Sequence, residues 1–403
     1  MNKEFDVIIN GAGLVGSSIA IALANQGMKI LIVEFQTLDR LYPQNDYGLR
    51  VSAFTPSSKN WLDYVGVWDQ LVHTGRVTPF IHMHVWDEGN RGELTFHAEG
   101  TGSDTLGWIL DNEVTQGVLL DEAKTKPGIT ILESSKIERF ERDNGKILVA
   151  LSSGDIYQGE LLIGADGGRS WVRTLADIPC TGWSYGQKTI VGQVRPEKDH
   201  QSTCWQRFMT NGPLALLPLN DGRCSLAWHT THEEADYLLS LPREEFAKHL
   251  EAGFEGKFGS FKADWNLGAY PLRLNHARDY VQPNLALAGD AAHSIHPLAG
   301  LGVNIGYLDA ATITDEVIKA RAEGVSLGDL SVLKRYEKRR KAHNMLIMGS
   351  MDLFKRSSTI QSPLIRKVRS LGLRAADKVP FAKRKLARVA MGYYGDIPEF
   401  IKP

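Results

Sequence analysis

The chain has 403 residues, of which 43% are hydrophobic and 23% are charged, a composition typical of a soluble globular protein. It is too long for one ordinary core, so we expect two domains, or one domain with extensions. Cys180, Cys204 and Cys224 show neither a CxxC pair nor metal-ligand spacing. We therefore expect no metal bound by cysteines. The three residues are expected to be reduced thiols in the core of a cytosolic protein.

Charge is distributed unevenly along the chain. The formal net charge is −1, but residues 331–403 carry 18 Lys and Arg against 5 Asp and Glu, whereas residues 1–330 carry 28 against 42. A basic tail on an acidic body predicts an anionic partner, and a membrane surface or a nucleic acid would fit. The first apolar run lacks a preceding basic segment and is interrupted by glycines, so we expect no signal peptide. No stretch reaches the roughly 20 apolar residues that span a bilayer.

The first motif is a strand, a glycine-rich turn, a helix and a second strand. Phe5–Asn10 is a β-branched run that enters GAGLVG at Gly11–Gly16. A helix is expected over Ser17–Asn25, and a second strand, KILIVE, ends at Glu34. This is the context in which a GxGxxG pattern indicates dinucleotide binding.

Each glycine of this motif has a separate expected role. Gly11 permits a tight turn, Gly13 lets the backbone approach a pyrophosphate, and Gly16 lets helix and strand pack closely. The carboxylate of Glu34 can accept hydrogen bonds from both ribose hydroxyls but would repel a 2′-phosphate. The pattern therefore predicts an ADP-like nucleotide, as in FAD or NAD.

The next hundred residues interrupt the parallel α/β rhythm. Arg50 lies at the start of LRVSAFT, which is expected to lead from a loop into a helix. Residues 77–108 contain FIHMHVWD and ELTFHAE, which indicate an insertion of antiparallel strands. Residues 108–122 return as a helix with Asp111 and Asn112 at its N-terminal end.

A second turn follows a run of strands. Ile129–Gly164 alternates as several strands with a turn at Ser153–Asp155. The last strand enters Gly164–Arg173 (GADGGRSWVR), in which Asp166 belongs to the turn and Ser170 to the first turn of a helix. Alone, this is a capped helix start. As a second Gly/Asp turn after a strand, it favours part of a ligand cradle.

Residues 180–275 are rich in strand-like stretches with Trp and Gln, and REEFAKHLEAGF is the one helical piece between them. This composition predicts a mixed β domain that presents an apolar, aromatic wall to a ligand. An ordinary core accounts for most of the aromatic residues, so only one or two are expected in a pocket.

The third turn lies in LAGDAAHSIHPLAGLGVN, residues 287–304. An apolar strand ends before Asp290, and glycines at 289, 300 and 302 allow close approach of a ligand. A helix opens at Asn304, so the loop delivers free N–H groups where the helix dipole favours negative charge. Asp290 is suited to accept hydrogen bonds from hydroxyls. The alternative is an ordinary strand-to-helix turn.

The C-terminal region is expected to be helical. Ile305–Glu323 forms one helix, Leu327–Ser331 is a joint, and LKRYEKRRKAHNMLIMGSMDLFK continues as helix. Beyond Pro363, LIRKVRSLGLRAADKVP and AKRKLARVAMG place apolar residues at helical spacing with Lys and Arg between them. This amphipathic basic pattern favours binding to anionic lipid. A helical cap with one solvated face is the alternative.

Together the three turns resemble one family. GAGLVG with Glu34, GADGGRSWVR and GDAAHSIHP are similar to the motifs of the class A flavin-dependent aromatic hydroxylases of the p-hydroxybenzoate hydroxylase fold. WQRF, GPLALLPL, RYEKRR, AMG and GDIP further resemble the ubiquinone-biosynthesis hydroxylases, which act on polyprenylated phenols and benzoquinols. The resemblance covers nearly the whole chain.

The resemblance implies an α/β fold, in which a Rossmann-like FAD-binding domain carries an inserted mixed β-sheet substrate domain and a C-terminal helical extension. The implied ranges are 1–75, 109–178 and 276–325 for the FAD-binding domain, 76–108 and 179–275 for the substrate domain, and 326–403 for the basic helical region.

The resemblance also implies site residues. Those expected to bind FAD are Gly11, Gly13, Gly16, Glu34, Arg50, Asn112, Asp166, Asp290, Gly302, Val303 and Asn304. Those expected to line the isoalloxazine, where the reaction occurs, are Pro297, Gly300, Leu301 and Gly302. Asp166 would contact both FAD and NAD(P)H, and Asp290 the ribityl chain. Two positions depart from the family: Leu301 replaces the usual Gln and keeps only a backbone donor, and Glu113 stands where many members have Arg.

The implied activity is ring hydroxylation of a polyprenylated phenol or benzoquinol in ubiquinone biosynthesis, using FAD, O₂ and transiently bound NAD(P)H, through a flavin C4a-hydroperoxide. Tyr185, His229, Tyr270 and His296 are candidates to favour the phenolate, and the sequence does not rank them. A flavin-dependent reductase and a non-catalytic flavin-bearing subunit of a quinone-synthesis complex remain open. We expect a cytoplasmic protein on the inner membrane or in such a complex, without a nucleic-acid partner because the tail lacks stacking aromatics.

Overall fold

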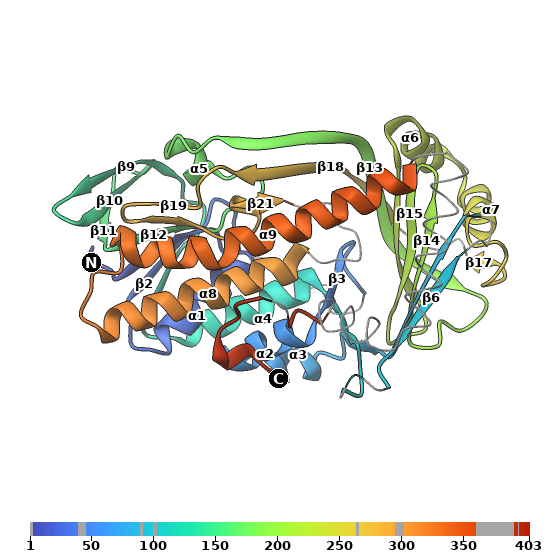
Figure 1. The fold of residues 1–403 in the computed structure, drawn as a ribbon, viewed down its shortest axis with the longest axis horizontal. Helices are drawn as coiled ribbons and strands as arrows, with labels where there is room; N and C mark the ends of the chain where they lie inside the picture. The colour runs from blue at the N-terminus through green and yellow to red at the C-terminus, as the bar shows by residue number, and fades with distance from the viewer. Residues whose placement is uncertain are drawn as a thin grey trace.

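A computed structural model describes residues 3–38, 46–88, 92–99, 101, 103–262, 266–294, 302–359, 391–393 and 395–403, with the backbone alone at residues 185, 348 and 350–359. Within these ranges the chain forms a mainly parallel sheet at one end and a long mixed sheet at the other (Figure 1). The helices pack mostly against the parallel sheet, as Figure 1 shows.

The parallel sheet is built from short apolar strands. Its order is β19 (Val281–Gln282), β20 (Leu285–Leu287), β12 (Leu161–Gly164), β1 (Val7–Asn10), β2 (Ile30–Val33) and β8 (Ile129–Leu132). All pairs are parallel except β19 with β20. Every residue of β1 and β2 is buried, as expected for strands covered on both faces. The predicted strands at both ends of the first motif are confirmed.

Four helices pack in series beside this sheet: α4 (Asn112–Thr125), α1 (Leu14–Ala24), α8 (Gly302–Ala322) and α9 (Leu330–Thr359). Helix α9 runs from the parallel sheet to the long sheet (Figure 1). Helix α8 begins at Gly302, two residues earlier than expected, and α9 begins within the predicted joint. Within the described residues, no helix is both long enough and apolar enough to cross a membrane.

Two of the short helices, α2 (Pro56–Tyr64) and α5 (Trp171–Leu175), begin at side-chain caps, whereas α3 (Trp68–His73) begins without one. Thr55 accepts a hydrogen bond from the N–H of Ser58 at the start of α2, and Ser170 accepts one from Arg173 in α5. Both pairings satisfy N–H groups that the helix itself leaves free.

The chain also forms two small antiparallel sheets. One contains β3 (Val51–Phe54), β7 (Gly107–Asp111) and β4 (Val77–Phe80), and the other contains β9 (Ile137–Asp143), β10 (Lys146–Leu151) and β11 (Ile156–Gly159). The second sheet confirms the strands predicted from the alternating pattern.

The first small sheet corrects two predictions. Arg50 precedes a strand rather than a helix, and residues 108–111 are strand rather than helix. Both segments adopt strand structure because they pair with each other, Ala53 opposite Ile109. The predicted capping position is confirmed, since Asp111 accepts hydrogen bonds from the N–H groups of Glu113 and Val114 at the start of α4.

The long sheet has the order β21 (His293–Ser294), β18 (Leu267–Ala277), β13 (Cys180–Pro196), β16 (Cys224–Thr231), β15 (Gly212–Pro218), β14 (Thr203–Met209), β5 (His82–Asp87) and β6 (Glu93–His97), with β17 (Phe261–Lys262) beside β13. Strands β13 and β18 extend along the molecule toward the parallel sheet (Figure 1). Strands β5 and β6 are antiparallel, as expected, but β5 runs parallel to β14.

One face of the long sheet is covered by α6 (His232–Ser240), which the sequence analysis missed, and by α7 (Arg243–Gly253), which it predicted. Ile190, Leu226 and Trp228 point to this apolar side. Because side chains alternate along a strand, Thr189, Ala227 and His229 point to the opposite face.

The cysteines differ from expectation in one case. Cys204 and Cys224 are buried free thiols, and burial raises the pKa of each. Cys180 is exposed, because it begins β13 at the outer end of its pairing with β18. It is therefore a surface thiol rather than a core residue.

Candidate functional site

The first glycine turn joins β1 to α1 and packs against the second turn. Gly11 has φ +109°, and a Cβ added there would lie 2.5 Å from the carbonyl oxygen of Ala165. A Cβ added at Gly16 would overlap the carbonyl oxygen of Gly11. Gly13 differs, since no heavy atom of the described residues lies within 4 Å of its added Cβ. Gly11 and Gly16 thus serve packing, and Gly13 leaves room for a ligand.

The N-terminus of α1 is available to an anion. Gly13 is the capping residue and offers no side-chain cap, and the first turn contains no acidic residue. The unpaired N–H groups and the helix dipole favour a negatively charged group at this position.

Glu34 lies beside the same turn. One carboxylate oxygen accepts a hydrogen bond from the N–H of Ala12 (2.8 Å), and the other accepts one from Gln36 (2.8 Å). A carboxylate has about four acceptor positions, so Glu34 keeps capacity for further donors. Its contact with a ribose stays a prediction.

Asp166 organises the second turn. One oxygen accepts hydrogen bonds from Asn10 Nδ2 (2.9 Å) and from the N–H groups of Trp171 (2.7 Å) and Val172 (3.1 Å), and the other accepts one from the Ser170 hydroxyl (2.5 Å). Four donors fill the usual capacity of a carboxylate. Its predicted contact with FAD and NAD(P)H stays a prediction, and the side chain holds the turn against the end of β1.

Arg173, which sequence reasoning placed only at the end of the motif, joins the second turn to the third. Its guanidinium donates to the carbonyl oxygens of Gly168 (3.0 Å) and Ala291 (2.7 Å). A Cβ added at Gly168 would lie 2.8 Å from the Ser294 hydroxyl. The two turns therefore lie against each other.

The third turn is a short 3₁₀ helix, η1 (Gly289–Ala291), at the end of β20. Gly289 has φ +60°, a conformation that favours glycine, and its added Cβ would lie 3.1 Å from Val15 of α1. The Asp290 side chain is accessible to solvent. Dense protein around it raises the pKa of its carboxyl, while His293 and Arg50 act in the opposite sense. The charge of Arg50, 240 residues earlier in the chain, thus favours the ionised form of Asp290.

Asn304 fastens the start of α8 to the β3–α2 connection. Its side-chain oxygen accepts hydrogen bonds from the N–H of Thr55 (2.9 Å) and the hydroxyl of Ser58 (2.7 Å), and its amide donates to the Ala53 carbonyl (2.7 Å). This side chain is committed to the protein. Binding by Gly302, Val303 and Asn304 would therefore use backbone groups of the helix N-terminus.

Arg50 and Asn112 are neighbours. The N–H of Asn112 donates to the Arg50 carbonyl (3.1 Å), and the Arg50 guanidinium lies over the Tyr270 ring at 5.6 Å from its centroid. The side-chain oxygen of Asn112 is buried without a hydrogen-bond partner in the part of the chain described. One helical turn later in α4, the Gln116 side chain donates to the Ala12 carbonyl (2.9 Å). This hydrogen bond joins α4 to the first turn.

Together with the hydrogen bond from the N–H of Gly289 to Asp309 of α8 (3.0 Å), these contacts form a closed circuit through the first turn, the second turn, the third turn, α8, β3 and α4. The circuit contains every predicted FAD-binding residue that the structure describes, and it fits a cofactor. Gly13 and Gly302 face space clear of the described residues, and Asn112 offers an unsatisfied acceptor. Pro297, Gly300 and Leu301, and the candidate His296, lie outside the described residues.

Two of the residues proposed to favour the phenolate lie together on the long sheet. Thr189 on β13 is paired with His229 on β16 and with Tyr270 on β18, so the three side chains share one face. His229 and Thr189 are buried, and Tyr270 lies beside Arg50. The Thr189 hydroxyl has no partner among the described residues. Sequence reasoning missed Thr189 because a lone Thr in a strand carries no functional signal. The structure describes only the backbone of Tyr185.

The family comparison decides the class of protein. The family described as FAD binding domain matches residues 4–350. The chain belongs to this family. Membership confirms the expectation of an FAD-binding protein.

The sequence is also 33% identical to 3-demethoxyubiquinol 3-hydroxylase of Escherichia coli K12, over 97% of this chain and 99% of that one. It is 32% identical to the human mitochondrial ubiquinone biosynthesis monooxygenase COQ6, over 96% and 92% of the two chains. The resemblance drawn from the motifs is confirmed.

Solved structures agree on the fold. The p-nitrophenol 4-monooxygenase PnpA of Pseudomonas putida superposes with a TM-score of 0.82 at 19% identity, covering 99% of this chain and 100% of that one. PqsL of Pseudomonas aeruginosa, a probable FAD-dependent monooxygenase, superposes with a TM-score of 0.76 at 22% identity, covering 92% and 100%. The predicted fold class is confirmed.

Proposed function

We propose that this chain is an FAD-dependent monooxygenase that hydroxylates the aromatic ring of a polyprenylated phenol or benzoquinol in ubiquinone biosynthesis. The observation that carries the proposal is the closed circuit of contacts that gathers the predicted cofactor residues beside the polar row Thr189–His229–Tyr270. The substrate class is supported by the two relatives, whose names specify hydroxylation of demethoxyubiquinol and monooxygenation in ubiquinone biosynthesis.

Each part of FAD would be bound by different residues of the circuit. The N-terminus of α1 at Gly13 would take the pyrophosphate, and Glu34 the adenosine ribose. Asp290 would take the ribityl hydroxyls. The start of α8, with Pro297, Gly300 and Leu301 before it, would face the pyrimidine ring, where the positive end of the helix stabilises negative charge. When bound and reduced by NAD(P)H, FAD supplies the activation of O₂.

The sheet residues would position the substrate. A buried hydroxyl without a partner is costly, so Thr189 gains from a hydrogen bond to a ring oxygen of the substrate. His229, on the neighbouring strand, is placed to take or hold the phenol proton. The small side chain of Ala227 leaves an apolar surface next to this polar row, and apolar walls exclude water from the reacting atoms.

We further propose that the protein works at an anionic membrane surface, or in a quinone-biosynthesis complex there. A polyprenylated substrate resides in lipid, and residues 363–390 carry nine Lys and Arg against one Asp. Attraction to anionic lipid is about 1 kcal/mol for each Lys or Arg near the surface, so such a tail supplies ample binding.

The proposed activity is tested with labelled oxygen. The purified protein is incubated with FAD, NAD(P)H, a prenylated phenol and ¹⁸O₂, and the mass of the product is measured by mass spectrometry. One ¹⁸O atom should enter the ring, the other should leave as water, and one NAD(P)H should be oxidised per hydroxylation. A parallel reaction in H₂¹⁸O with unlabelled O₂ should yield no label. Anaerobic turnover of the substrate would instead favour a reductase, and FAD binding without any turnover would favour a non-catalytic subunit.

A further inference from the structure

We propose that Asp309 is a positioning residue for the Gly289–Asp290 turn, and that through Asp309 helix α9 sets the orientation of the carboxylate expected to bind the ribityl chain. The inference rests on FAD binding and does not depend on which substrate is hydroxylated. Asp309 is absent from every motif that the sequence analysis recognised.

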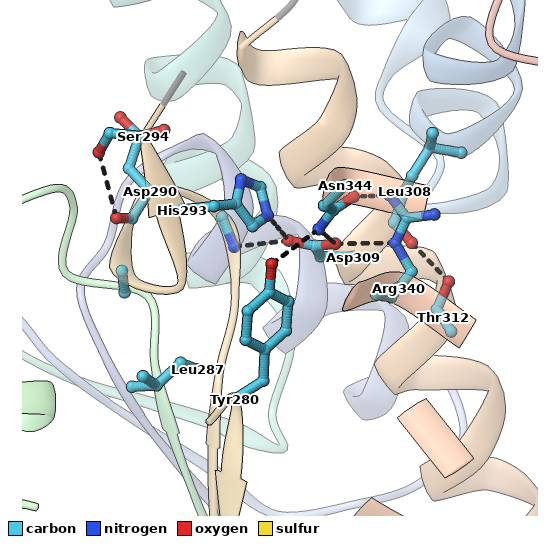
Figure 2. Close-up of polar contacts among 12 residues, drawn as sticks. Tyr280, Leu287, Asp290, His293, Ser294, Leu308, Asp309, Thr312, Arg340 and Asn344 are labelled. Carbon is cyan, nitrogen blue, oxygen red and sulfur yellow. Dashed lines mark hydrogen bonds and ion pairs between the residues drawn. The ribbon is translucent and has the colours of Figure 1, made fainter. Parts of the chain in front are cut away.

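Asp309 lies on α8 with no exposed surface and collects donors from three directions (Figure 2). One carboxylate oxygen accepts hydrogen bonds from the N–H of Gly289 (3.0 Å) and from His293 Nε2. The other accepts from Arg340 Nε (2.8 Å) and Asn344 Nδ2 (3.2 Å), both on α9. Two donors on each oxygen fix the carboxylate in position and in rotation.

The charges in this cluster favour the ionised carboxylate. Burial alone would raise the pKa of Asp309, but His293 and Arg340 hold it well below its usual range. Arg340 is itself 1% exposed, so the two opposite charges compensate each other inside the protein. Because an ionised carboxylate only accepts hydrogen bonds, His293 must carry its proton on Nε2.

The turn is held at both of its ends. Asp309 binds the N–H of Gly289, and Arg173 binds the carbonyl of Ala291 (2.7 Å). Asp290 is the residue between these two anchors, and its own side chain is exposed toward solvent. The direction of the Asp290 carboxylate therefore depends on the two anchors, and the Asp309 anchor depends on donors from α9.

The chain offers a matched control on the same pair of helices. Glu316 lies two turns after Asp309 on α8 and is buried to a similar degree (4% exposed). It pairs with Arg335 (2.7 Å) and Arg339 (2.8 Å) of α9. It thus joins α8 to α9 as Asp309 does, but it lies away from the Gly289–Asp290 turn.

The test compares Asp309→Asn with Glu316→Gln in the full chain. The measurements are the dissociation constant for FAD from flavin fluorescence, the visible circular dichroism of the bound flavin, and the thermal midpoint of the apoprotein. The amide of Asp309→Asn presents a donor where the carboxylate accepted, so we expect FAD binding at least about 10-fold weaker, the size expected for loss of a hydrogen bond to a charged group. The flavin dichroism should change as well. Asp290→Ala is the reference variant, because it shows how far FAD affinity and flavin dichroism change when the Asp290 carboxylate is removed.

Glu316→Gln should lower the thermal midpoint yet keep FAD binding within about 2-fold of wild type, because it removes a tie between helices and not the anchor. Equal losses of FAD affinity in both variants, or an unchanged affinity and flavin dichroism in folded Asp309→Asn, would overturn the proposal. If Asp309→Asn does not fold, Asn344→Leu removes one donor to Asp309 and one acceptor of Arg340, and it leaves the Asp309–Arg340 ion pair. That variant should bind FAD about 3-fold more weakly with altered flavin dichroism, and wild-type values would equally overturn the proposal. A wild-type protein that binds FAD but hydroxylates nothing would end the proposed activity alone.

Discussion

Gly13 and Gly16 lie three residues apart in the first turn, but their surroundings differ. A Cβ at Gly16 would overlap the carbonyl of Gly11, whereas a Cβ at Gly13 would meet none of the described residues. Gly13 also has φ −76°, which alanine adopts readily. Gly16 is thus required by the fold, whereas Gly13 is not, and we expect Gly13 to be required by the ligand.

Alanine substitutions should separate these two roles. Gly13→Ala should leave the stability of the apoprotein within about 0.5 kcal/mol of wild type, as for other substitutions that meet no neighbour. It should weaken FAD binding at least about 10-fold, which is about 1.4 kcal/mol, because the new methyl group occupies the expected path of the pyrophosphate. Gly16→Ala should destabilise the apoprotein itself by about 1–3 kcal/mol through overpacking.

Urea unfolding of the apoproteins and titration with FAD provide the two measurements. Normal FAD affinity in Gly13→Ala would contradict the assignment of the α1 N-terminus to the pyrophosphate. The two variants serve as controls for each other, since each adds the same methyl group to the same turn.

At the scale of elements, α9 and β18 place two imidazoles where they resist protonation. His276 lies on β18 and His343 on α9. Burial lowers the pKa of each from 6.5 to about 4, and the positive charges of Lys341 near His276 and Arg340 near His343 add to the effect. The folded protein therefore keeps both rings neutral through mildly acidic pH.

This arrangement predicts acid sensitivity with a defined window. Above pH 6.5 both rings are neutral in the folded and unfolded states, so the free energy of unfolding is independent of these groups. Between pH 6.5 and about 4 the unfolded chain binds as many as two more protons, so stability falls as the pH falls. Below about pH 4 the folded protein is protonated too, and this contribution to the slope ends.

Urea unfolding at several pH values measures the proton uptake. His343→Gln should reduce the uptake between pH 6.5 and 4 by about one proton. His73→Gln, at an exposed position of α3, is the control and should leave the slope unchanged. An unchanged slope in His343→Gln would show that the ring is already charged in the folded state.

At the scale of the whole molecule, the last residues of the chain return to the helical end. The Phe400 ring stacks on Tyr64 of α2 with centroids 4.2 Å apart, and Asn60 donates to the Lys402 carbonyl (2.9 Å). Arg339 of α9 pairs with Asp396 (3.1 Å). Residues 391–393 and 395–403 thus belong to the folded body near α2, whose N-terminus is bound by Asn304.

A test of membrane binding must leave these C-terminal contacts intact. Replacing every Lys and Arg between positions 363 and 390 with Gln removes the positive charge and keeps residues 391–403. The fraction of protein that sediments with anionic liposomes should fall at least about 10-fold, given about 1 kcal/mol for each basic residue near the surface. FAD content should not change.

Neutral liposomes provide the background, and added salt should weaken the binding of wild type because the attraction is screened. Undiminished sedimentation of the substituted protein would refute a role for this region in lipid binding. A simple truncation at position 363 would mix this effect with the loss of the packing on α2.

Local sequence patterns determine several structural features of this protein. The apolar run of β1, the glycine spacing of the first turn and the cap at Asp111 depend on neighbours within a few residues, and the sequence predicts all three correctly. The strand after Arg50 is different, because it forms only by pairing with β7, more than fifty residues away.

By itself, the sequence therefore determined the family, the three glycine-containing turns that are expected to bind FAD, and the residue types that each turn presents. Only the tertiary structure decided that the charge of Arg50 acts on Asp290, that Thr189 lies between His229 and Tyr270, and that Asp309 binds the third turn. The physical reason is range. A turn is encoded by the conformations its own residues allow, whereas a buried carboxylate acquires its role from donors that folding brings together from distant segments.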